Sequence, residues 1–104
     1  MMQQWAAARQ AYADGKPEAV AAYKDLVRRY PDVPDLTGEL GNIYFQNGSM
    51  REAAEQYYET AQRLIRRGEP GLAACLVDVM RYLDNDKAKA LQEQVKVPCP
   101  VLRK

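Results

Sequence analysis

The residue types that carry most enzyme chemistry are scarce in this chain. There is no histidine among its 104 residues, which removes the commonest general base and transition-metal ligand, and with it Ser-His-Asp and Cys-His nucleophiles. Cys75 and Cys99 are not accompanied by further ligands at zinc-site spacing. Gly38 and Gly41 lie close together, but no predicted strand precedes them, as a phosphate loop requires. The sequence therefore predicts a protein that is not an enzyme and binds no metal or cofactor.

The two cysteines lie in different contexts. Cys75 belongs to the apolar run 72–77, where we expect a small buried side chain. Cys99 lies between Pro98 and Pro100 in a predicted extended tail, where we expect a free, exposed thiol; a reactive or partner-linking thiol is the alternative. Two cysteines so placed do not indicate a disulfide framework.

The composition is that of one small globular domain. A chain of 104 residues suffices for a single modest core. The net charge of +1, from 15 basic and 14 acidic residues, lacks the basic excess of a nucleic-acid surface. No apolar run approaches the roughly 18 residues of a membrane span, and no signal peptide is visible. The sequence does not determine the cellular compartment. We favour the cytoplasm, with the periplasm as the alternative if the segment comes from a membrane-anchored protein.

Turn-forming residues divide the chain into segments of helical length with apolar spacing near 3.6. Helices are predicted over 2–13, 17–30, 35–46, 49–67, 70–83 and 86–95, followed by an extended or disordered tail over 98–104. We expect Asp35, Ser49 and Asn85 to cap three of these helices. Linkers of three to six residues place successive helices antiparallel. The predicted fold class is all-α, an α-α superhelix of helical hairpins with five to six helices.

Aromatic and small residues recur along the chain with a period of 32 to 34. The recurring pairs are Tyr12 and Tyr44, Gly15 and Gly48, Ala19 and Ala53, and Tyr23 and Tyr57. A period of this size means that one helical unit is used more than once, and such units bury their apolar faces by stacking.

These residues resemble a tetratricopeptide repeat, a 34-residue helix-turn-helix unit. A unit over about 34–68 matches best, although Thr60 stands where the family has a small alanine; its matching residues are Leu40, Gly41, Tyr44, Gly48, Ala53 and Tyr57. A unit over about 1–33 follows with Trp5, Tyr12, Gly15, Ala19, Tyr23 and Pro31. A degenerate unit over 69–96 is expected to cap the stack. Alternatively, the helix over 49–67 also serves as the first helix of an overlapping third unit.

The resemblance implies a groove lined by the first helix of each unit, in which a peptide or helix of another protein binds. The expected groove residues are Gln10, Asp35, Asn42, Phe45 and Gln46. The carboxamide of Asn42 would hold a backbone amide of an extended peptide through two hydrogen bonds. Phe45 would be an exposed apolar anchor. These positions carry no basic cluster, so we expect no clamp for acidic C-terminal tails.

The function that this resemblance implies is that of a scaffold in the assembly of a bacterial multi-protein complex. The expected partner is another protein, with no nucleic acid and no membrane insertion by this segment. The alternative is a structural homo-oligomerisation element. In that case an identical chain would cover the exposed end of the repeat stack, giving a symmetric homodimer.

Overall fold

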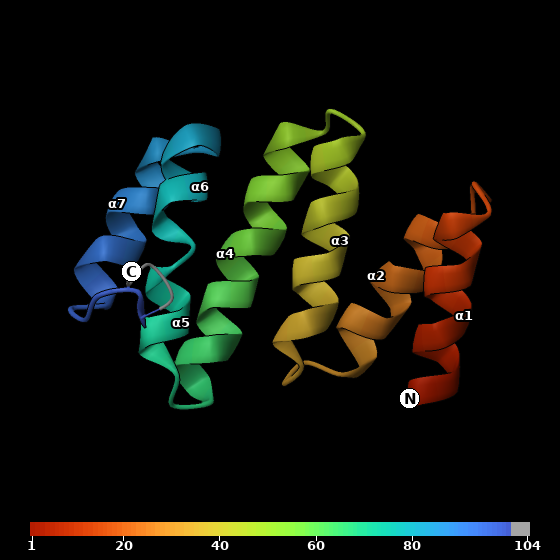
Figure 1. Ribbon diagram of the computed structural model, residues 1–104, viewed down its shortest axis with the longest axis horizontal. Coiled ribbons are helices and arrows are strands. Elements are labelled where there is room, and N and C mark those ends of the chain that lie inside the picture. Colours follow the sequence, from red (N-terminus) through yellow and green to blue (C-terminus); the bar gives the residue numbers. More distant parts are fainter. Residues whose placement is uncertain (101–104) are drawn as a thin grey trace.

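The computed structural model describes residues 1–100, and this part of the chain contains helices and no strand. Figure 1 shows the helices in a row, with α1 at one end and α7 at the other. In chain order they are α1 (Met2–Ala13), α2 (Ala19–Arg29), α3 (Pro34–Gln46), α4 (Met50–Arg66), α5 (Pro70–Ala74), α6 (Val77–Leu83) and α7 (Asn85–Gln94). Most helices that are neighbours in sequence pack on each other, above all α3 on α4. The predicted all-α class of antiparallel helical hairpins is confirmed.

A glycine with left-handed backbone closes the turn between α3 and α4. Gly48 has a φ of 80°, which glycine adopts without the steric cost that a Cβ would bring. The following residue, Ser49, donates its N–H to the carbonyl of Tyr44 at 2.8 Å. This hydrogen bond closes a Schellman-type helix end. Gly15, with a φ of 70°, ends α1 in the same way.

Several helix starts differ from the sequence prediction. The second helix begins at Ala19, because Pro17 lies in a turn that precedes it. The cap of α7 is Asp84, one residue before the expected Asn85, and its Oδ1 accepts from the N–H groups of residues 86 and 87 at 3.1 and 3.2 Å. The side chain that reaches back to these N–H groups therefore decides where the helix starts.

Two further expected caps are absent as hydrogen bonds. The N-cap position of α3 is Val33, so Asp35 lies inside the helix, in its acidic first turn. Pro34 takes the first helical position, where its missing N–H costs nothing. Ser49 does occupy the N-cap of α4, but its side chain makes no capping hydrogen bond.

The predicted helix over 70–83 is broken into α5 and α6. The N–H of Cys75 donates to Leu72 O at 3.1 Å, and that of Leu76 donates to Ala73 O at 3.0 Å. These bonds span three residues instead of four, and so form a tighter turn that ends α5. Apolar spacing continues through this turn, which is why the sequence predicts one helix here.

Two apolar cores meet at α3 and α4. The core beside α1, α2 and α3 contains Trp5, Ala8, Tyr23, Leu26, Leu36, Leu40 and Ile43. The core of α4 to α7 contains Ala53, Ala54, Tyr57, Ala61, Ala73, Val77, Met80, Ala88, Leu91 and Val95. Tyr44 packs against both. The α3–α4 hairpin therefore joins the two halves of the row.

A buried arginine fastens α4 to the turn between α2 and α3. Arg63 is only 4% exposed. Its guanidinium donates to the carbonyls of Val27, Tyr30 and Val33, each at 3.0 Å. The carbonyl of Val27 has no helical donor, because the residue four positions on is Pro31, which has no N–H. Arg63 therefore supplies the hydrogen bond that Val27 O cannot receive within α2, and it joins α4 to two further carbonyls of the turn.

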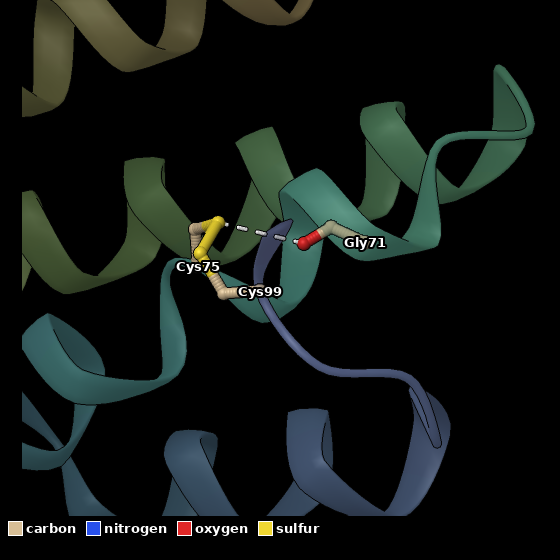
Figure 2. The surroundings of a disulfide bond; sticks show 3 residues. All are labelled: Gly71, Cys75 and Cys99. Carbon is tan, nitrogen blue, oxygen red and sulfur yellow. Dashed lines mark hydrogen bonds between the residues drawn. A yellow bond between two sulfur atoms is a disulfide. The ribbon is translucent and has the colours of Figure 1, made fainter. Parts of the chain in front are cut away.

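The cysteines correct the sequence interpretation. Cys75 and Cys99 form a disulfide, with their Cα atoms 4.7 Å apart (Figure 2). The expectation of a free, exposed Cys99 thiol is wrong: the chain after α7 folds back onto α5, and Cys99 is 9% exposed. Neither local context shows this return of the chain. The rest of the predicted tail, 101–104, lies outside the described residues.

Candidate functional site

One face of α3 is left uncovered along the length of the helix. We call it the α3 face and define it by Asp35, Gly38, Glu39, Asn42 and Gln46, which recur at helical spacing. All five are exposed or partly buried. The face is therefore the part of α3 that a partner can reach.

A hollow lies on each side of the α3 face. The first, of about 180 Å³, is lined by Tyr12, Tyr23, Glu39, Asn42, Ile43 and Gln46. The second, of about 330 Å³, is lined by Asp35, Gly38, Glu39, Asn42, Tyr57, Thr60 and Leu76. Glu39 and Asn42 border both hollows, so the side chains in the middle of the face separate them.

Glu39 ties the first two helices to α3. Its Oε1 accepts from Trp5 Nε1 at 2.9 Å, from the Tyr23 hydroxyl at 2.6 Å and from Arg9 Nε at 3.1 Å, and its Oε2 accepts from Arg9 Nη2. Burial raises the pKa of Glu39, but the hydrogen bonds from Arg9, Tyr23 and Trp5 outweigh it and hold the pKa below its ordinary value of 4.5. Glu39 is therefore an ionised structural hub on this face.

Replacing Glu39 with Gln is expected to lower the free energy of unfolding by about 2 kcal/mol at neutral pH, because the charge that faces Arg9 is lost. Since the pKa of Glu39 is lowered by folding, its stabilisation is present above about pH 4.5 and is lost as the pH falls through the lower folded value. Urea unfolding should thus show the two proteins converging in acid. Exposed Glu55→Gln is the control. A wild-type advantage that stays constant from neutral to acid pH would contradict this role.

Asn42 offers donors to the solvent and has its oxygen engaged. The Tyr57 hydroxyl donates to Asn42 Oδ1 at 2.5 Å. Burial raises the pKa of Tyr57, which keeps this phenol protonated as a donor. Within residues 1–100 the Asn42 Nδ2 group makes no hydrogen bond, and the residue is exposed. The carboxamide therefore presents only its two N–H donors to a partner. The sequence prediction had both the oxygen and the NH₂ group bind the peptide.

The remaining expected groove residues divide into two sets. Asp35 and Gln46 lie on the α3 face with Asn42, and Gln46 Oε1 accepts from the Tyr12 hydroxyl. Gln10 lines neither hollow and donates to Asp14 at 2.9 Å. Phe45 also lines neither hollow: it is partly buried against the core of α4 to α7. The structure thus brings together three of the five residues.

Sequence reasoning missed Leu76 beside this face, and an exposed aromatic side chain, Tyr82, that lines neither hollow. Leu76, at the junction of α5 and α6, lines the second hollow. Tyr82 of α6 is 75% exposed, and its ring centroid lies 6.4 Å from that of Phe45. The apolar residues at helical spacing in the helix predicted over 70–83 are Leu72, Leu76, Val79, Met80 and Leu83. Tyr82 is not among them, and this is the one signal that would have marked it as a surface aromatic.

Clusters of metal ligands and membrane-spanning helices are both absent from the part of the chain that the structure describes. Residues 1–100 hold no cluster of three or more potential metal ligands. None of their helices has both the length and the apolar character needed to cross a membrane.

A family model described as Tetratricopeptide repeat matches residues 6–71, which is more than half of the chain. The chain belongs to the tetratricopeptide repeat family. The matched range takes in most of α1 and all of α2, α3 and α4, and so contains the whole α3 face. No curated protein and no solved structure matches significantly. Tetratricopeptide repeats generally mediate protein–protein interactions and are typically not catalytic, which gives the class of function.

Proposed function

We propose that this tetratricopeptide repeat protein binds an extended segment of a partner protein along the α3 face, as a scaffold in the assembly of a bacterial multi-protein complex. The observation that carries the proposal is the state of Asn42. Its oxygen is held by Tyr57, while its two N–H donors have no partner among residues 1–100 and lie on an exposed helix face between two hollows. Such donors suit a backbone carbonyl of an extended chain.

The dimensions of the face fit a short peptide. Asp35 and Gln46 are eleven positions apart on α3, which is about 16 Å along a helix. An extended chain covers that length with about five residues. Alternate side chains of the segment would enter the hollows on either side of Asn42.

The charges of the face favour a segment with a basic side chain. Asp35 is exposed and makes no ion pair within residues 1–100, whereas Glu39 is already paired with Arg9. A lysine or arginine of the partner would therefore meet Asp35. An acidic segment would instead be repelled by the like charge of Asp35, which gives selectivity against it.

Asn42→Asp tests the proposal. The carboxylate still accepts from Tyr57, but the two donors are lost, so a backbone carbonyl would meet a negative charge. The probe is a phage-displayed random peptide library selected on the wild-type chain, and the selected peptides are titrated by calorimetry. Asn42→Asp should bind them about tenfold more weakly or worse, a loss of about 1.4 kcal/mol.

Asn47→Asp is the matched control, because it makes the same change of charge at the end of α3, outside both hollows. It should keep the wild-type affinity. The proposal fails if the library yields no peptide, or if the selected peptides bind both variants as they bind wild type.

Homo-oligomerisation is the second candidate, and one observation favours it. The side of α1 and α2 that faces away from α3 has a mostly apolar hollow of about 350 Å³, lined by Gln4, Ala7, Ala8, Ala11, Glu18, Ala22, Asp25 and Leu26. A second chain could cover this end face symmetrically. Sedimentation of the free chain at tens of micromolar separates the candidates, since a monomer there removes this one.

A further inference from the structure

The chain after α7 crosses back over α5. Cys99 joins this segment, residues 96–100, to Cys75 at the end of α5 (Figure 2). Pro100 packs at Gly71, where a Cβ would lie 3.3 Å from Pro100 Cδ and 3.7 Å from Pro98 O. The missing side chain of Gly71 therefore makes room for the segment.

Little besides the disulfide holds the segment in place. Within residues 1–100, no hydrogen bond or ion pair joins 96–100 to the helices, and Val97 is 44% exposed. A hollow of about 400 Å³ lies between the segment and the helices, with Val77 and Arg81 among its lining residues. The segment is thus poorly packed, and its attachment depends on the Cys75–Cys99 bond.

The attachment point is also where α5 ends. Cys75 is the C-cap of α5, which has only five residues, too few to be stable as an isolated helix. The Sγ of Cys75 lies 3.5 Å from Gly71 O (Figure 2). The next residue, Leu76, lines the second hollow beside the α3 face. Making or breaking the disulfide at Cys75 therefore affects both α5 and the lining of the second hollow beside the α3 face.

We propose that the Cys75–Cys99 disulfide is a redox-controlled latch, opened by a dithiol reductant. Cys75 is the more exposed cysteine, so the first thiolate of the reductant attacks its sulfur. The S–S bond breaks, and Cys99 leaves as a thiolate that takes up a proton. The second thiol of the reductant resolves the mixed disulfide, which releases Cys75 as a thiol and leaves the reductant oxidised. The open chain frees residues 96–100 and loosens α5.

Hydrogen exchange of the full chain, followed by mass spectrometry with and without dithiothreitol, tests the latch. Reduction should speed exchange about tenfold or more in peptides covering 70–76, where the N–H groups of residues 72, 73, 75 and 76 are hydrogen-bonded, because local opening no longer works against the cross-link. Peptides from α1 and α2 should be unchanged. The double variant Cys75→Ser/Cys99→Ser should exchange like the reduced chain, and dithiothreitol should not change its exchange rates.

Two results would overturn the latch. One is alkylation of both cysteines in the untreated protein, which would show that the bond does not form. The other is a reduced chain whose α5 exchanges as slowly as in the oxidised chain, or whose helices all accelerate equally, which would show a bond that does not act locally. Circular dichroism of the double variant separates local release from loss of the fold.

Discussion

Replacing Arg63 with Met should lower the free energy of unfolding by about 4 kcal/mol, measured by urea denaturation. Methionine fills much of the same space but donates no hydrogen bond. The carbonyls of Val27, Tyr30 and Val33 would then stay buried without their charged donor. Tyr30 O would keep the N–H of Val33 at 3.4 Å, but Val27 O would lose a donor that its own helix cannot replace. Breaking a buried hydrogen-bond network of this kind is among the few causes of losses this large.

Two variants separate this effect from charge and size. Arg66→Met removes an exposed arginine of the same helix that shares Glu59 with Arg63, and it should cost less than about 0.5 kcal/mol. Arg63→Lys keeps the charge but lacks the planar fork that reaches three carbonyls, so it should recover only part of the loss. An Arg63→Met chain within about 1 kcal/mol of wild type would show that the arginine is not needed to fasten α4.

The second large effect is expected at Gly41. A Cβ there would lie 2.7 Å from Tyr57 Cε1 and 2.8 Å from Cδ1. The Tyr57 ring is 8% exposed and its hydroxyl is bonded to Asn42, so the ring cannot turn aside without losing that bond. Gly41→Ala should therefore destabilise the chain by about 2 kcal/mol, although alanine is the better helix former by about 1 kcal/mol.

Gly38 provides the control on the same helix. A Cβ at Gly38 meets Thr60 Cγ2 at 3.8 Å, an ordinary contact. Gly38→Ala should therefore stabilise the chain by about 0.5–1 kcal/mol, through helix propensity alone. Thermal or urea unfolding of both variants measures the contrast. If both variants change the free energy of unfolding in the same direction, then the close approach of α3 and α4 is not the reason that a side chain is disfavoured at Gly41.

The parts of the fold that depend on local residues could be predicted from the sequence. The predicted helix over 2–13 coincides with α1, and the turn at Gly48 follows from the need for a left-handed residue. The 34-residue spacing of Tyr23 and Tyr57 indicated the family, since stacked units repeat their packing residues. Each of these features is encoded within a short window or a regular period.

The parts that depend on distant residues could not be predicted. The role of Arg63 could not be predicted, because its three acceptors lie 30 to 36 positions earlier. The hydrogen bonds of Glu39 could not be predicted either, because its donors Trp5 and Arg9 belong to another helix. The pairing of Cys75 with Cys99 could not be predicted, because 24 positions and the whole of α6 and α7 separate them. Such contacts depend on how helices are placed in space, which residue spacing alone does not specify.

The neighbour-on-neighbour packing of the row has a kinetic consequence. Most contacts form between helices that follow one another in the chain, so each can close after only a short loop has been ordered. Little chain entropy is lost before a contact is gained. Proteins with such low contact order typically fold within microseconds to milliseconds. During synthesis each hairpin can therefore dock as soon as it emerges, before Cys99 follows it and the disulfide can close.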